Sequence, residues 1–233
     1  MLIEIGQKAK ETSYILGKMG TDLKNAGLLA AAQEILDEED EILKANAADV
    51  AKAKERGMAP GLVDRLELNH KRIEGIVEGM RQVVGLEDPV GEVISMKRRP
   101  NGLLIGQKRV PFGVIGIIYE ARPNVTADAF ALCFKTGNAV ILRGGSDALE
   151  SNKAIVTAIR NGLKKEGIPE DAISLIEDTS HETAREFMRM NGYLDVLIPR
   201  GGAGLIRTVV ENSTVPVIET GTGNCHIYVD ESA

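Results

Sequence analysis

The sequence has no tryptophan, few aromatic residues and few cysteines, and each scarcity excludes a class of protein. Aromatic residues make up 3% of the chain, which argues against stacking platforms for nucleic-acid bases. The two cysteines, Cys133 and Cys225, lie in otherwise apolar stretches and form no metal-type cluster, so they suit a reducing cytoplasm better than a disulfide framework. No apolar run approaches membrane-spanning length, and no charged head followed by an apolar block opens the chain. We therefore predict a cytoplasmic protein with no membrane partner and no metal site.

An excess of positive charge is also missing. The formal net charge is -6 and the sequence pI is about 5.3, which argues against a nucleic-acid or anionic-membrane partner because either would require a basic face. Any positive site must therefore be local. With 233 residues, 43% of them hydrophobic, the chain can bury an aliphatic core and suits one large or two modest domains.

The first third of the chain has a helical pattern. From Ile3 to about Leu86, apolar residues recur at helical spacing, and breaks at Gly20 and at 57–60 divide the pattern into several helices. We interpret residues 1–91 as an N-terminal helical region.

A β-hairpin is predicted next. Val93 to Val110 is interpreted as two short strands around Pro100-Asn101-Gly102, because Asn-Gly supplies the positive φ angles of a tight turn. Such a ribbon, with little core of its own, typically projects from the body and pairs with a neighbour, so we assign residues 92–110 to a projecting, oligomerisation-type hairpin. Its flanks are basic at Lys97, Arg98, Arg99, Lys108 and Arg109.

After Pro111 the pattern changes to alternating strands and helices. Most of the apolar runs lack polar alternation, as strands buried on both faces of a parallel sheet should. Helical patterns at about 126–136, 148–166, 181–191 and 203–211 separate them, which predicts a doubly wound, mostly parallel α/β sheet of the Rossmann type over residues 111–233. The expected strands are Val114 to Ile118, Ala139 to Leu142, Ile173 to Ile176, Val196 to Ile198, Val215 to Ile218 and His226 to Val229.

The most informative feature is a repeated device, in which a strand-like run ends in Arg-Gly-Gly and leads into a helix. It occurs at 143–145 and again at 200–202. Glycines allow a sharp turn and close approach to a ligand, the helix start offers unpaired N–H groups, and arginine adds a positive fork. Each Gly-Gly could instead be only a strand-to-helix turn, but two copies on successive units favour a phosphate-bearing ligand. The predicted cofactor-binding residues are Arg143, Gly144, Gly145, Ser146, Arg200, Gly201 and Gly202.

The cofactor preference follows from two of these residues. A Gly-x-Gly-x-x-Gly fingerprint is absent, since Gly113 and Gly116 lie before or within the first strand. Arg143 and Ser146 stand just beyond the second strand, where NAD-binding domains often carry a carboxylate for the ribose hydroxyl. A cation and a hydroxyl fit a 2′-phosphate there, so we predict NADP rather than NAD; the alternative is that Arg143 only caps a surface.

The histidines and cysteines give weak signals. Cys225 precedes His226, but adjacent residues of a strand point to opposite faces, which separates a thiol from its base. Cys133 lies on a presumed core helix, where a small buried hydrophobe is the better interpretation. His70 and His181 show no partner spacing.

Polar groups after two strands are further candidates. Arg122 and Asn124, in the loop after the first strand, could bind an anionic substrate or an oxyanion, whereas Glu120 could simply neutralise Arg122. Glu219 follows a strand and precedes glycines, so it could project into a cleft, and a structural or solvent-facing role is equally plausible.

Four long segments resemble the γ-glutamyl phosphate reductase family, also called glutamate-5-semialdehyde dehydrogenase, of the aldehyde dehydrogenase superfamily. Shorter matches at 46–50, 62–66 and 88–91 extend the resemblance over essentially all 233 residues. The four segments are PFGVIGIIYEARPNV at 111–125, GNAVILRGG at 137–145, IPRGGAGLI at 198–206 and GNCHIYVD at 223–230.

The resemblance implies an enzyme that uses NADPH to reduce L-glutamyl 5-phosphate to L-glutamate 5-semialdehyde through a cysteine thioester, in proline biosynthesis. It also implies a homo-oligomer and contact with glutamate 5-kinase. The family nucleophile lies in a later Cys-Asn segment, and this chain stops at Ala233 before it. We therefore expect no catalytic residue here, a missing C-terminal catalytic domain and no activity of this chain alone. The alternatives are a non-catalytic cofactor-binding or assembly fragment and a related acyl-phosphate or aldehyde dehydrogenase.

Overall fold

A parallel sheet forms the centre of the protein, which we describe from a computed structural model covering residues 1–219, 221 and 225–232. Its strands have the order β5-β4-β3-β6, and every neighbouring pair is parallel. All six residues of β3 are buried, because helices cover both faces of the sheet. The strands are β3 (Val114–Tyr119), β4 (Ala139–Arg143), β5 (Ile173–Leu175) and β6 (Val196–Arg200).

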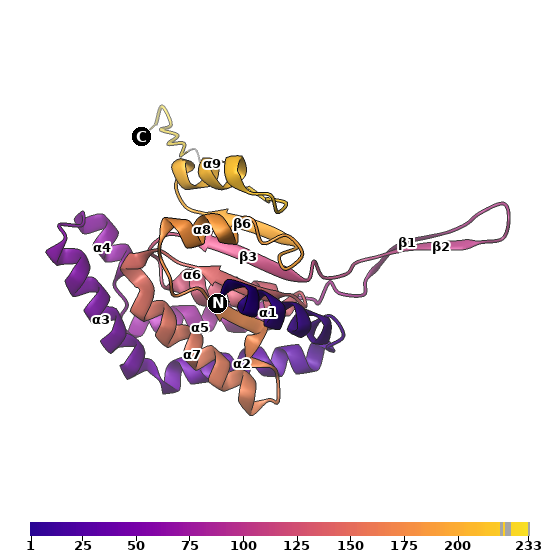
Figure 1. Ribbon diagram of the computed structural model, residues 1–233, viewed down its shortest axis with the longest axis horizontal. Helices are drawn as coiled ribbons and strands as arrows, with labels where there is room; N and C mark the ends of the chain where they lie inside the picture. The colour runs from indigo at the N-terminus through magenta and orange to yellow at the C-terminus, as the bar shows by residue number, and fades with distance from the viewer. Residues whose placement is uncertain (220, 222–224, 233) are drawn as a thin grey trace.

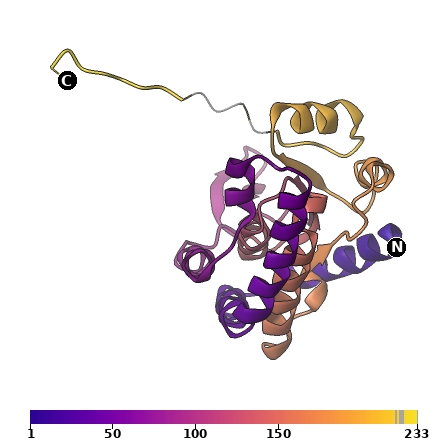
Figure 2. The same ribbon diagram turned by 90° about the vertical axis from the view of Figure 1, so that its left-hand side faces the viewer.

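Helices follow the strands in the crossovers of a doubly wound fold. Helices α6 and α7 contact one face of the sheet, while α1 and α8 lie on the opposite side (Figure 2). Gly116 of β3 allows this close packing, because a Cβ there would lie 2.9 Å from Cζ of Phe187 in α8. The bounds are α6 (Asn124–Lys135), α7 (Leu149–Lys165), α8 (His181–Phe187) and α9 (Ala203–Asn212), with 3₁₀ turns η1 (Ser146–Ala148) and η2 (Glu170–Ala172).

The predicted N-terminal helices are confirmed, and they pack onto the sheet layer rather than apart from it. Helix α2 packs on α7 and α5 on α6, so Leu28, Ile35 and Met80 share one apolar core with Phe130 and Phe134. The boundaries at 91 and 110 that we assign from the sequence stay predictions. The helices are α1 (Leu2–Leu16), α2 (Thr21–Asp37), α3 (Glu39–Glu55), α4 (Pro60–Leu66) and α5 (His70–Val84).

The predicted hairpin is also present. Strands β1 (Val93–Arg98) and β2 (Leu104–Lys108) pair antiparallel, and Gly102 takes a φ of 84° in the turn. The ribbon extends far from the body (Figure 1), and nearly all of its residues are exposed. Its pairing with a neighbour stays a prediction.

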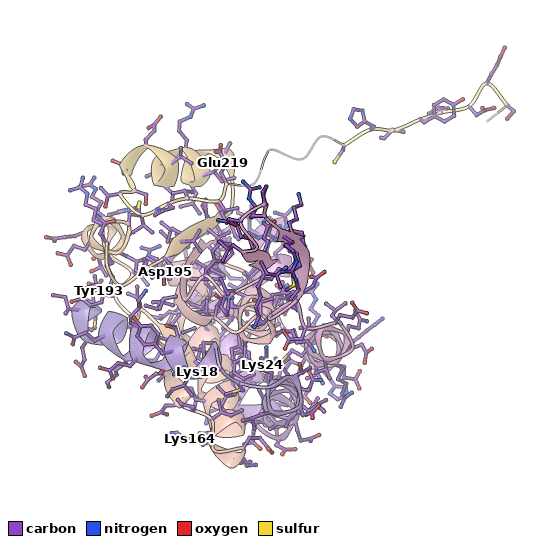
Figure 3. The ribbon with its side chains drawn as sticks, turned by 90° about the vertical axis from the view of Figure 1, so that its right-hand side faces the viewer. Lys18, Lys24, Lys164, Tyr193, Asp195 and Glu219 are labelled. Atoms are coloured by element: carbon purple, nitrogen blue, oxygen red, sulfur yellow. The ribbon has the colours of Figure 1, made fainter. Side chains whose placement is uncertain are left out.

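Asp195 fixes the amino ends of the two strands that lead to the candidate site. Its Oδ2 accepts from the backbone N–H of Val114 at 2.8 Å, and Nζ of Lys10 lies 2.8 Å from both carboxylate oxygens. A Cβ at Gly113 would lie 2.3 Å from Oδ2, so this carboxylate requires the glycine. Figure 3 shows Asp195 near the middle of the molecule. The contact holds β3 and β6 in register, so their carboxyl ends reach the same edge.

Three expectations need correction. Residues 215–218 form only a bridge between Val217 and Leu197, and the helix expected over 181–191 ends at Phe187. The strand expected at 226–229 is wrong: Ile227 is 91% exposed, and the segment pairs with no described strand. An apolar run forms a strand only where neighbouring backbone can satisfy its N–H and C=O groups. In the part of the chain that the structure describes, no helix has the length and apolar composition needed to cross a membrane.

His70 has partners that its spacing did not suggest to us. Its Nδ1 lies 2.7 Å from Oε1 of Glu39, and its Nε2 lies 3.2 Å from Oε1 of Glu74, one turn later in α5. The hydrogen bond that the imidazole donates to Glu39, and the charges of both carboxylates, raise the pKa of His70 above its ordinary 6.5. The stabilisation by this group is therefore complete below about pH 6.5 and is lost as the pH rises through the raised value.

We expect Glu39→Gln to lower the pKa of His70, because Glu39 raises this pKa more than Glu74 does. NMR titration of the imidazole protons measures this directly, and Glu182→Gln on α8 is the control for an unrelated acidic side chain. An unchanged titration midpoint in Glu39→Gln would contradict the assignment.

Candidate functional site

A cleft opens where β3 and β6 end. Its volume is about 380 Å³, and arginines from three separate elements contribute to its walls. A second cavity of about 710 Å³ adjoins it, because both are lined by Arg65 and Arg122. The parallel sheet therefore places a concave, arginine-rich surface at its carboxyl edge, as open α/β sheets commonly do for ligands. The lining of the smaller cleft is Arg65, Tyr119, Glu120, Arg122, Val125, Arg200, Gly201 and Gly202.

The second Arg-Gly-Gly turn holds a carboxylate of the protein itself. Gly202 is the N-cap of α9, and its backbone N–H donates to Oε1 of Glu120 at 3.0 Å. A Cβ at Gly201 would lie 2.7 Å from Cδ of Glu120, so the carboxylate fits only beside a glycine. Glu120 thus occupies the anion position at this helix start, where unpaired N–H groups favour negative charge. Our suggestion that Glu120 neutralises Arg122 is not what the structure shows.

The first Arg-Gly-Gly turn is packed against the end of β3. A Cβ at Gly144 would lie 2.5 Å from Nδ2 of Asn152, and one at Gly145 would lie 3.4 Å from the backbone N of Ala121. Behind the turn, Tyr119 and Asn152 are joined through the hydroxyl of Thr126 at 2.7 and 2.9 Å. Close packing therefore requires Gly144, which supports the interpretation of this segment as a strand-to-helix turn, whereas a Cβ at Gly145 would make only an ordinary contact. Gly144 is buried, Gly145 is half-buried and Ser146 is exposed.

Arg143 is anchored on one side. Its Nη2 donates to the backbone carbonyls of Thr179 and Ser180 at 2.6 and 3.3 Å. Its Nε is buried and has no hydrogen-bond partner among the described residues. Burial lowers the pKa of the guanidinium, and the nearby Asp178 opposes part of that shift. The side chain pins the loop after β5, and one of its donor groups is unsatisfied.

Arg122 and Asn124 lie close together at the start of α6, and only Asn124 bonds to another described side chain. Nδ2 of Asn124 donates to Oδ2 of Asp128 at 3.1 Å. Desolvation raises the pKa of Asp128, while Asn124 and the charge of Arg200 lower it in part. The side chains of Arg122, Arg200 and Arg65 make no ion pair with any described residue.

The remaining candidates lie away from the cleft. Cys133 is buried in α6, as predicted, whereas Cys225 and His226 are exposed in an extended segment. Glu219 is exposed and lies beside α9, at the top of the view in Figure 3. Gly223 and Asn224, part of the last segment that carries the resemblance, lie outside the described residues.

We expect the two thiols to differ strongly in reactivity. Burial raises the pKa of Cys133 to about 12, so only about 10⁻⁴ of it is thiolate at pH 8. Cys225 is exposed and should be alkylated by iodoacetamide within minutes in the native protein. Mass spectrometry of Cys225→Ser should show almost no label until denaturant is added, and rapid native labelling of that variant would show that Cys133 is accessible. Cys133→Ser is the matched control and should label as the unmodified protein does.

Comparison with known proteins identifies the family. The chain is 59% identical over 232 residues to the gamma-glutamyl phosphate reductase of Clostridium perfringens strain SM101, covering 100% of this chain and 56% of that protein. The chain belongs to the gamma-glutamyl phosphate reductase family. No family model matches it. This chain therefore spans about half the length of the curated reductases it matches.

Solved structures agree with this assignment. The crystal structure of the gamma-glutamyl phosphate reductase of Thermotoga maritima superposes with a TM-score of 0.94 at 51% identity, covering 99% of this chain and 56% of that one. A probable aldehyde dehydrogenase from Listeria monocytogenes superposes at 0.71 with 15% identity, which shows a shared fold. The predicted aldehyde dehydrogenase-like α/β class is confirmed.

The roles of two cleft residues in this reductase-family chain were not predicted from the sequence. Arg65 lies inside one of the short segments that carry the resemblance, but nothing in its own neighbourhood marks it as a ligand group. The capping role of Glu120 depends on a contact across 82 residues. Both assignments required the fold.

Proposed function

We propose that this chain carries the cofactor-binding part of an NADPH-dependent enzyme that reduces L-glutamyl 5-phosphate to L-glutamate 5-semialdehyde and phosphate, in proline biosynthesis. The observation that carries the proposal is the arginine- and glycine-lined cleft at the carboxyl edge of the sheet, in a chain 59% identical to proteins named gamma-glutamyl phosphate reductase. The proposed setting is the cytoplasm.

The residues at the first Arg-Gly-Gly turn fit a nicotinamide dinucleotide. When bound, NADPH supplies the hydride for reduction of the acyl group. Arg143 and Ser146 would meet its 2′-phosphate, since both belong to this turn, Ser146 is exposed, and Nε of Arg143 has no hydrogen-bond partner among the described residues. Gly145, which is half-buried and carries no side chain, would leave room for close approach to the ribose.

The second turn adds a condition. The proposal places Arg200, Gly201 and Gly202 near the pyrophosphate or nicotinamide, but the carboxylate of Glu120 now accepts from Gly202. A phosphate at this helix start has to displace Glu120, since two anions cannot share the same N–H groups without strong repulsion. Arg122 and Arg200 line the same cleft and can receive the displaced carboxylate.

On the substrate side we assign Arg122 and Asn124 to the anionic substrate. We assign the nucleophilic role to neither cysteine of this chain, because Cys133 is buried with a raised pKa and Cys225 is exposed with no base packed against it among the described residues. We therefore expect the chain to bind NADPH and to show no turnover of glutamate semialdehyde with phosphate and NADP.

Fluorescence titration of the purified chain with NADPH tests the proposal. Saturable binding, with competition by NADP and weaker binding of NADH, is the expected result. Absence of saturable binding by a chain that shows cooperative thermal unfolding would refute the cofactor assignment. Turnover that disappears in Cys225→Ser alone would show that the nucleophile is wrongly excluded.

A further inference from the structure

The larger cavity next to the cofactor cleft is lined by four cations, Arg65, Lys71, Arg72 and Arg122, and by three carboxylates, Asp64, Glu67 and Asp128. It is bounded by α4, the start of α5 and the turn between β3 and α6. Arg72 in this cavity is already neutralised, because its Nη2 lies 2.8 Å from Oδ1 of Asp64 and its Nη1 donates to two backbone carbonyls. Arg65 and Arg122 line both cavities and have no such partner among the described residues.

Arg65 is exposed, but the backbone that carries it is firmly held. Asn46, which is 2% exposed, donates from Nδ2 to the carbonyl of Leu66 at 2.9 Å and accepts from the N–H of Leu68 at 2.7 Å. These two bonds fix the end of α4 immediately after Arg65. Asn46 also bonds to Ser151 in α7, which ties α4 to the sheet layer.

A small apolar cluster sets the position of α4 relative to Arg122. Val63 and Leu66 of α4 pack with Ala148 of η1, and Ala121, the neighbour of Arg122, packs against the same cluster. The guanidinium groups of Arg65 and Arg122 are therefore brought to one cavity by core packing rather than by a contact between themselves. Glu67 and Asp128 line the same cavity but make no ion pair with Arg65 or Arg122 among the described residues, so both guanidinium groups keep donors for an anion.

We propose that Arg65 and Arg122 form an oxyanion clamp that selects the charged end of the substrate, with Arg65 as a specificity-determining residue. The ligand class is a small acidic amino-acid derivative, recognised through a carboxylate or a phosphate group by guanidinium forks. The assignment of this clamp to the substrate rests on the proposed function. The clamp adds Arg65 of α4 to the residues gathered at the carboxyl edge of the sheet.

Calorimetric titration of the chain with inorganic phosphate and, separately, with L-glutamate tests the clamp. At least one probe should bind saturably, and Arg65→Gln and Arg122→Gln should each weaken it about ten- to a hundred-fold. If only inorganic phosphate binds, the clamp recognises the phosphate end of the substrate. If only L-glutamate binds, it recognises the carboxylate end. Arg65→Lys, which keeps the charge and loses the fork, should give an intermediate loss.

Arg81→Gln is the matched control, since Arg81 is an exposed cation near the end of α5 that lines neither cavity. It should leave both affinities within two-fold. Affinities of Arg65→Gln within two-fold of the unmodified chain, or no saturable binding of either probe, would overturn the clamp. NADPH titration of the same samples separates the two proposals. If the unmodified chain does not bind NADPH, the cofactor assignment fails, while the anion titrations still report on the clamp.

Discussion

Replacing Gly162 with alanine is expected to destabilise the protein by about 2–3 kcal/mol. Gly162 lies in α7 where it crosses α2. A Cβ there would lie 2.5 Å from Cα and 2.6 Å from the backbone N of Ala31. These are main-chain atoms of a packed helix, so relief requires the two helices to separate along an interface that also buries Leu28 and Ile159.

Gly75 provides the matched control. It lies in α5, is exposed, and a Cβ there would have nothing within 4 Å. Gly75→Ala should therefore stabilise the protein by up to about 1 kcal/mol through helix propensity alone. Urea unfolding followed by circular dichroism measures both variants, and a loss below about 0.5 kcal/mol in Gly162→Ala would mean that the α2–α7 crossing is not as tight as described.

The contrast between these glycines shows what could be predicted from the sequence. Apolar runs at 114–118, 139–142 and 196–198 indicate buried parallel strands because they lack polar alternation, and the structure confirms them. The run at 226–229 looks the same by composition, yet no described strand lies beside it. A run of this kind reports only that apolar residues are available, whereas strand formation depends on a neighbouring backbone. Likewise, Gly162 and Gly75 are both helical glycines, and only the packing distinguishes them.

The candidate site divides in the same way. The two Arg-Gly-Gly turns could be placed at one edge because parallel strands bring their carboxyl ends together, a rule that needs only the strand pattern. The partner of Gly202 could not be predicted from the sequence, since Glu120 is 82 residues away. Glu120 also competes with any bound phosphate for the same N–H. Arg65 reaches the cleft only through the packing of α4 against Ala121 and Ala148. Local spacing carries no information about either contact.

Arg143→Ala is expected to abolish most of a preference for NADPH over NADH. The two cofactors differ in the 2′-phosphate, and a charge-assisted contact from a partly buried guanidinium contributes about 1.5–3 kcal/mol, or about ten- to a hundred-fold in affinity. The ratio of the two dissociation constants is the decisive measurement, because Arg143 also pins the backbone at Thr179 and Ser180. Loosening that loop should weaken both cofactors together and leave the ratio unchanged.

Arg160→Ala separates these two effects. Arg160 of α7 also donates to a backbone carbonyl, that of Ile173 at 3.0 Å, but it belongs to neither Arg-Gly-Gly turn. It should lower stability without changing the NADPH to NADH ratio. The preference of the unmodified chain should also decrease as salt is raised, since dissolved ions screen the attraction between the guanidinium and the phosphate. Equal dissociation constants for NADPH and NADH in the unmodified chain would show that Arg143 serves only the loop, and that its unpaired Nε faces no phosphate.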